Sequence, residues 1–375
     1  KVARLHLQYG KTRTDLRQPP RNGAMRSVPP SMPIRNRWMR PNRLSDPYSA
    51  PAKTATTAIG LKKTSLLVGV IAALVLTATW LTSPNSLGQS DLPVHQPDAV
   101  AGERIFWAAG CASCHATPVD GRRAKGEDKL RLGGGLQLDT PFGLFRVPNI
   151  SPHPSDGIGG WTMLEFVNAM QKGVSPSGRH YYPSFPYTSY ARMNTRDVMD
   201  LKAFVDGLPA IVGQPEDHDL KFPYSIRRGL GLWKRRYLAV DPVIENTSAD
   251  SQLLAGRYLV EGAGHCGECH TPRDIFGGLD TNRWLAGAPN LDGEGGVPDI
   301  TPAGKNVSAW SAGDIAYYLE SGFTPDFDTV GGTMVAVQEN MAKLTREDRA
   351  AIAAYLKSIP ASKLRTGAAD SDDDS

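Results

Sequence analysis

Two short runs of the sequence each combine paired cysteines with a histidine. They are Cys111–His115, which reads Cys-Ala-Ser-Cys-His, and Cys266–His270, which reads Cys-Gly-Glu-Cys-His. Two thiols three positions apart on a turn can bond the two vinyl groups of a haem, and the adjacent histidine then meets the iron from one face. The sequence therefore predicts two haem c groups, with covalent attachment and axial ligation by Cys111, Cys114, His115, Cys266, Cys269 and His270.

Two other uses of this cysteine spacing are known. A thioredoxin-like redox pair and half of a zinc site both place cysteines three positions apart. A redox pair does not need the histidine, however, and all 4 cysteines of the chain belong to the two motifs. The repetition of the whole motif favours haem. Because haem is attached to such motifs outside the bacterial cytoplasm, we expect the protein to be exported.

The sixth ligand decides what each iron can do, since methionine opposite histidine raises the potential and closes the iron to small molecules. In the second half of the chain, Met334 lies in a Gly-Gly-Thr-Met loop, and Met341 is the alternative. In the first half, the aligned position is Phe185, which cannot bind iron. We therefore favour Met193 as the distal ligand there, with His180 or an open iron as alternatives.

The motifs occupy the same place in an internal repeat. The stretch AGERIFWAAGCASCHATP, from Ala101, is echoed by AGRYLVEGAGHCGECHTP, from Ala255. Further on, VPNISP at 147–152 matches VPDITP at 297–302. Each repeat is about 110 residues long, which is a common size for a domain.

Three helices are expected in each repeat. One leads into the cysteine motif, at 101–109 and 255–261. A second follows a tryptophan, where Thr162-x-x-Glu165 and Ser311-x-x-Asp314 resemble capping boxes. The last begins at Thr195 or Thr345 and ends before a proline. We find no convincing alternating strand between them, so the predicted fold is mainly α.

An uncharged apolar run precedes the repeats. No charged residue lies between Thr64 and Ser90. Within this run, residues 66–81 are almost wholly apolar, and such a stretch is close to the roughly 20 residues that a membrane-spanning helix needs. Residues 1–63 hold 14 Lys or Arg against two Asp. A basic leader directly before an apolar run indicates a membrane protein rather than a protein that binds nucleic acid. The positive charges place the N-terminus in the cytoplasm. A retained anchor at 64–84 is favoured over a cleaved signal peptide.

Several longer runs carry a family resemblance. TPFGLFRVPNISPHPSDGIGGW, YYPSFPYTSYARM, HCGECHTPRD and GFTPDFDTVGGTM resemble the membrane-bound cytochrome c subunits of bacterial alcohol and related quinone-linked dehydrogenases. The similarity covers residues from about Pro97 to Pro360. It implies a subunit that takes electrons from a periplasmic dehydrogenase catalytic subunit and passes them to quinone, a terminal oxidase or another part of the respiratory chain. It also implies His/Met ligation, which supports Met334 and Met193.

The expected organisation is two tandem class I cytochrome c domains behind one transmembrane helix in the inner membrane, with the haem domains in the periplasm. The boundaries are a basic leader at 1–63, the anchor at 64–84, domains at 95–212 and 251–363, a connecting segment at 213–250 and an acidic tail at 364–375. Well-known relatives carry three haem domains and this chain has two, so the substrate of its partner is not carried over.

Two other functions stay open at this point. One is a dihaem enzyme of the peroxidase or thiosulfate-oxidising type, in which one haem iron is open, and the position of Phe185 favours it. The other is an electron shuttle without a fixed partner. Readily formed carbon monoxide or cyanide adducts would distinguish the enzyme from the relay.

Overall fold

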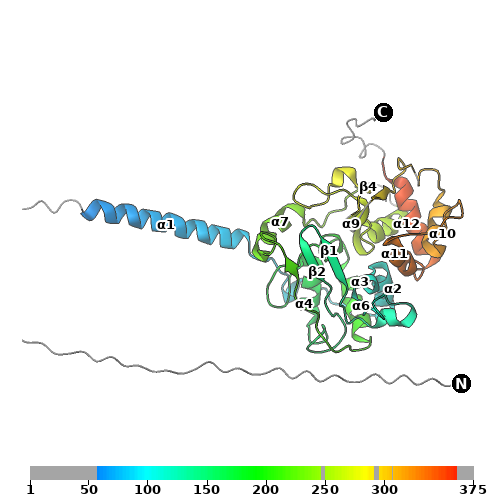
Figure 1. Cartoon of the computed structure of the whole chain (residues 1–375), viewed down its shortest axis with the longest axis horizontal. Coiled ribbons are helices and arrows are strands. Elements are labelled where there is room, and N and C mark those ends of the chain that lie inside the picture. Colours follow the sequence, from blue (N-terminus) through cyan, green and yellow to red (C-terminus); the bar gives the residue numbers. More distant parts are fainter. Residues whose placement is uncertain (1–56, 246–249, 291–294, 306, 361–375) are drawn as a thin grey trace, which may run out of the picture. The chain divides into compact units, whose positions relative to one another are not determined.

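The computed structural model (Figure 1) describes residues 57–245, 250–290, 295–305 and 307–360. The predicted leader, up to residue 56, and the predicted acidic tail lie outside the described residues.

The apolar run forms one long helix, α1 (Thr57–Leu81). Its part from Thr64 to Leu81 has a mean hydropathy of 2.1, and by length and composition it is the single helix among the described residues that could cross a membrane. The large apolar side chains along it are exposed, including those of Leu66, Leu74 and Leu76. A core helix of a globular protein would bury such a face, whereas α1 leaves it exposed.

The first repeat is built from short helices around the first cysteine motif. In chain order these are α2 (Ala99–Ala108), α3 (Cys111–His115), α4 (Met163–Val167) with the π-helical turn η3 (Asn168–Lys172), α5 (Tyr187–Tyr190) and α6 (Thr195–Asp206). Two 3-10 turns, η1 (Gln89–Asp91) and η2 (Gly126–Leu130), lie before α2 and after α3.

The second repeat follows the same plan. Its elements are α8 (Ser251–Tyr258) with the π-helical turn η5 (Leu259–Ala263), α9 (Gly267–His270), the 3-10 turn η6 (Thr281–Arg283), α10 (Ala312–Ser321), α11 (Met334–Met341) and α12 (Arg346–Ser358). Between the repeats lie the 3-10 turn η4 (Arg227–Gly229) and α7 (Leu230–Tyr237).

Glycines at one repeat position let the first and last helices of each repeat cross closely. A Cβ on Gly102 would overlap the carbonyl oxygen of Asp200, where α2 crosses α6. A Cβ on Gly256 would overlap the carbonyl oxygen of Ala351, where α8 crosses α12. Any larger residue would push the helices apart. The crossings hold the helix that leads into each cysteine motif against the last helix of the same repeat.

The expected absence of strands was wrong. A three-stranded antiparallel sheet is formed by β1 (Gln137–Thr140), β2 (Gly143–Arg146) and β3 (Asp219–Leu220), and β4 (Ala286–Pro289) pairs with β5 (Gly296–Asp299). The longest of these strands have 4 residues. Strands this short do not show the alternation over roughly 4–8 residues by which a strand is recognised, and β4 and β5 also contain glycine and proline.

The helix starts agree with the sequence prediction. Thr162 with Glu165 and Ser311 with Asp314 form reciprocal capping boxes, and the Thr345 hydroxyl accepts a hydrogen bond from the Asp348 amide. The described residues are mostly helical.

Candidate functional site

Each motif histidine is oriented by a proline carbonyl. The Nδ1–H of His115 donates to the carbonyl oxygen of Pro148 at 2.8 Å, and that of His270 donates to Pro298 at 2.7 Å. Both prolines are the second residue of the repeated VPNISP and VPDITP segments. A carbonyl can only accept, so it fixes the proton on Nδ1 and leaves the Nε2 lone pair for a metal. Burial lowers the pKa of His115 to about 4 and also lowers that of His270, which keeps both rings neutral.

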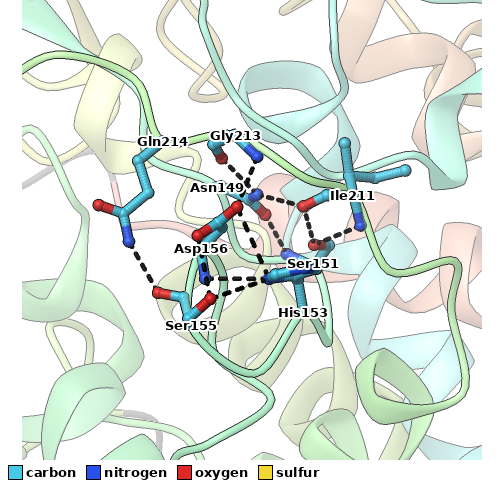
Figure 2. Close-up of polar contacts among 8 residues, drawn as sticks. All are labelled: Asn149, Ser151, His153, Ser155, Asp156, Ile211, Gly213 and Gln214. Carbon is cyan, nitrogen blue, oxygen red and sulfur yellow. Dashed lines mark hydrogen bonds and ion pairs between the residues drawn. The ribbon is translucent and has the colours of Figure 1, made fainter.

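A polar network anchors the loop that carries the first of these carbonyls (Figure 2). Asn149, directly after Pro148, donates from Nδ2 to the carbonyl oxygens of Ile211 at 2.7 Å and Gly213 at 2.8 Å. The Gly213 amide donates to the Asp156 carboxylate at 2.8 Å. The segment after α6 is thereby bonded to the loop.

In the second repeat, Asp299 stands at the position of Asn149. Its carboxylate accepts from the Thr301 amide at 2.8 Å and from the Thr301 hydroxyl at 2.7 Å. The orienting carbonyl is thus held by polar side-chain bonds in both repeats, by a different residue in each.

The cysteine environments do not suit a redox pair or a zinc site. Burial, with the neighbouring cysteine as the smaller cause, raises the pKa of Cys111 and of Cys266 to about 12. Redox-active pairs need a lowered thiol pKa instead. Within the described ranges, no group of three or more His, Cys, Asp or Glu side chains is gathered as a zinc ion would require.

The candidate distal residues occupy different surroundings. Met334 is the first residue of α11 and is partly buried, while Met341 ends that helix and is buried in the core. Met193 is buried, and a Cβ on Gly262 of the second repeat would lie 3.4 Å from the Cγ of Met193.

Phe185 and His180, the other two residues considered for the first repeat, contact protein groups. The ring of Phe185 lies 5.7 Å from the ring of Tyr190. The Tyr190 hydroxyl donates to the carbonyl of Ala109, two residues before the first motif. His180 bonds through Nε2 to the Thr82 carbonyl at 3.0 Å.

Two other histidines and one arginine of the repeats bond protein groups. His153 accepts the Asp156 amide on Nδ1 at 3.1 Å. His265 donates from Nε2 to the Ala109 carbonyl at 3.2 Å. Arg273 pairs with Glu268 at 2.7 Å and also bonds the Gly277 carbonyl.

Comparison with known proteins settles the family. The sequence model of the cytochrome c family matches residues 99–209 and 255–360. The chain belongs to the cytochrome c family. A diheme cytochrome c-type protein of Cereibacter sphaeroides is 53% identical over 301 residues, which cover 79% of this chain and 98% of that protein.

Dehydrogenase subunits are more distant relatives. The fructose dehydrogenase cytochrome subunit of Gluconobacter japonicus is 34% identical over 271 residues, 71% of this chain and 54% of that protein. The cytochrome c subunit of a quinone alcohol dehydrogenase from Gluconobacter oxydans is 32% identical over 268 residues, 69% of this chain and 54% of that protein. The aligned region is thus about half the length of these two subunits. The resemblance found in the sequence is confirmed.

This cytochrome c carries two haem c groups, as predicted. The donor sets fit them: a neutral imidazole whose Nδ1 is bonded to a carbonyl, directly after a pair of thiols, occurs once in each repeat.

The third residue of each haem motif contacts the opposite repeat, which sequence reasoning missed. Ser113 accepts a hydrogen bond from Asn340 Nδ2 at 2.7 Å and donates to the Ala336 carbonyl, both on α11. Glu268 accepts from the hydroxyls of Thr188 at 2.8 Å and Ser189 at 3.1 Å, both on α5. Each motif is therefore tied to the helix that precedes the last helix of the other repeat.

The first and last helices make a second reciprocal pair of contacts. Arg104 of α2 binds the Asp348 carboxylate of α12 through two nitrogens, at 2.6 and 2.9 Å. The hydroxyl of Tyr258, at the matching position of α8, donates to Asp197 of α6. Equivalent residues thus bond equivalent partners in both directions, as a pseudo-twofold relation between the repeats requires.

Proposed function

We propose that this cytochrome c is a membrane-anchored dihaem electron-transfer subunit of a periplasmic dehydrogenase. It takes electrons from the catalytic subunit and passes them to quinone or another acceptor of the respiratory chain. The observation that carries the proposal is the matched pair of imidazoles, each fixed by a proline carbonyl beside two thiols. When bound, each haem supplies one-electron redox chemistry, and the chain itself contributes attachment, orientation and exclusion of water.

The proposed organisation is two tandem class I domains, at 95–212 and 251–363, joined by 213–250 and anchored by 64–84. Lys62 and Lys63 before the apolar run favour a cytoplasmic N-terminus and periplasmic haem domains. The dehydrogenase cytochrome subunits among the relatives support a catalytic partner of this class. The exposed apolar surface of α1 supports the anchor.

We assign covalent attachment to Cys111, Cys114, Cys266 and Cys269, proximal ligation to His115 and His270, and distal ligation to Met193 and Met334. Met334 begins α11, and two residues of this helix, Ala336 and Asn340, bond Ser113. Met193 follows α5, which is tied to Glu268 in the corresponding way. The two distal candidates thus lie next to the two helices that bridge the repeats.

The reciprocal contacts support transfer between the haems inside one molecule. Both motifs bond across the same interface, through Ser113 and Glu268, so their relative position is fixed by side chains rather than by the linker. A fixed separation keeps the electron path constant from one molecule to the next.

The test is isolation of the tagged full chain from the membranes of its source organism. We expect a large dehydrogenase subunit to co-purify, and both haems to become reduced when a substrate of that subunit is added. A variant with Cys266→Ala and Cys269→Ala should still bind the partner and show one haem reduced. Haems that stay oxidised beside an active bound dehydrogenase would overturn the proposal.

A second candidate is a dihaem enzyme with one open iron. Phe185 at the position aligned with Met334 favours it, as does the packing of Met193 against Gly262 of the other repeat. Ligand binding separates the two, because a displaceable or empty distal position binds carbon monoxide and a methionine-ligated iron does not.

A further inference from the structure

The segment that connects the two repeats lies against the C-terminal end of α1. In α7, Gly231 has no room for a Cβ, which would fall 2.6 Å from the Cα of Thr82, immediately beyond α1. The guanidinium of Arg235 lies 5.2 Å from the ring centre of Trp80. The contacts therefore include both backbone and side chains at this end of the apolar helix.

Two arginines of this segment bond the last carbonyl groups of α1. Arg228 donates to the Thr79 carbonyl at 2.8 Å, and Arg235 donates from Nε to the Leu81 carbonyl at 2.7 Å. The last carbonyls of a helix have no partners within it and carry the negative end of its dipole. The arginines thus cap α1, and α7 lies within one turn of the end of the apolar run.

This stretch is also strongly basic. Residues 221–240 include no acidic residue and six basic ones: Lys221, Arg227, Arg228, Lys234, Arg235 and Arg236. Lys234 is buried and bonds the carbonyls of Lys172 and Gly173, and Arg227 lies against the ring of Tyr182. The side chains of Lys221, Arg228, Arg235 and Arg236 are exposed.

Exposed apolar side chains alternate with these cations. Phe222 is 80% exposed, Ile226 54% and Leu232 51%. Leu232 follows Arg228 by four residues and precedes Arg236 by four, so the three share one face of the helical segment. Mixed apolar and basic surface of this kind is typical of helices that lie in a membrane interface.

We propose that residues 221–240 form a lipid-binding platform that takes anionic lipid headgroups on Arg228, Arg235 and Arg236 and inserts Leu232 at the membrane surface. The inference rests on the proposed anchoring role of α1. A helix of 18 apolar residues is roughly 27 Å long, close to the roughly 30 Å of the hydrocarbon core. A segment that caps its end must then lie at headgroup depth, where Trp80 also belongs.

Lipid fits this surface better than a protein partner does, because α1 sets the position of residues 221–240 relative to the membrane. The cap brings residues 221–240 to the bilayer surface in every anchored molecule, whether or not a partner is bound. The platform would hold the haem domains at a fixed height and tilt above the membrane.

The first test places the haem-loaded full chain in nanodiscs of phosphatidylcholine with phosphatidylglycerol. A spin label at Leu232→Cys is compared with one at Tyr317→Cys, an exposed residue of α10. We expect lipid-soluble oxygen to relax the Leu232 label more than an aqueous nickel chelate does, and the reverse at Tyr317. If the protein co-elutes with the discs but the nickel chelate relaxes both labels equally, the platform is overturned and the anchor is not. Failure to co-elute would overturn both.

The second test measures whether the binding of residues 221–240 depends on the negative charge of the lipid headgroups. Hydrogen exchange of residues 221–240 should be slower in discs with phosphatidylglycerol than in phosphatidylcholine alone. Arg236→Gln should reduce this difference, because among the described residues Arg236 bonds only its neighbour Tyr237. Arg122→Gln, in an exposed loop of the first repeat, should leave it unchanged. Protection that appears only after a purified dehydrogenase subunit is added would instead identify a protein interface and contradict the lipid assignment.

Discussion

At the scale of single residues, the haem motifs depend on groups outside their own five positions. The imidazoles are oriented by the carbonyls of Pro148 and Pro298, which lie 33 and 28 residues further along the chain, respectively. The third motif residue, Ser113 or Glu268, is used for contact with the other repeat. The spacing of Cys and His identifies the cofactor, and these supporting residues fix its placement.

Met193 can be tested by replacing its sulfur while keeping its volume. Met193→Leu should lower the midpoint potential of one haem and remove its sulfur-to-iron charge-transfer absorbance, because methionine ligation raises the potential. Spectroelectrochemistry of the purified chain measures both. Met199→Leu, at a buried position of α6, serves as the control and should change neither. An unchanged spectrum and potential in Met193→Leu would exclude this ligand.

Lys234 should make stability depend on pH. Burial lowers its pKa from 10.5 to about 7 in the folded chain. Between these values the unfolded chain holds a proton that the folded chain lacks, so the free energy of unfolding rises as the pH increases from about 7 toward 10.5. Below pH 7 both states are protonated and this increment is absent.

Lys234→Met should therefore flatten the rise of the melting temperature across this interval, whereas Lys343→Met, at an exposed position, should preserve it. Thermal unfolding followed at several pH values between 7 and 10 provides the comparison. The same slope in all three proteins would show that Lys234 is not the titrating group.

At the scale of elements, the helix crossings that present the motifs depend on two equivalent glycines. Gly102→Ala should destabilise the fold by about 1–3 kcal/mol, because the new Cβ meets the Asp200 backbone where α2 crosses α6. Gly313→Ala, in α10, has only the Ser311 hydroxyl at 3.5 Å and should be neutral or stabilising by up to about 1 kcal/mol. Denaturant titration distinguishes the two, and similar losses in both would contradict the crossing.

The sequence predicted the elements that have local signals. The capping boxes and the helices before each motif were found because their residues are neighbours in sequence. The helices α5, α7 and α11 were missed, since they are short or contain glycine within otherwise irregular stretches. The capping of α1 by Arg228 and the bond between Ser113 and Asn340 join residues 149 and 227 positions apart, and no local pattern records such pairs.

At the scale of the whole molecule, the two repeats are bonded so extensively that they should unfold together. Asp348→Asn removes the charge from the bidentate contact with Arg104 and should cost about 1.5–3 kcal/mol. Glu216→Gln, whose side chain is 83% exposed beside Arg146, should cost less than about 1 kcal/mol. Differential scanning calorimetry should show one transition in each protein. Two separate transitions in the unmodified chain would contradict a shared interface.

In the proposed relay, both irons are closed by methionine and neither performs catalysis. Carbon monoxide added to the fully reduced full chain at neutral pH tests this most directly. The relay predicts that the absorption spectra of both haems stay unchanged. A rapid, stoichiometric carbon monoxide adduct on one haem would contradict it and identify that haem as the open site of an enzyme.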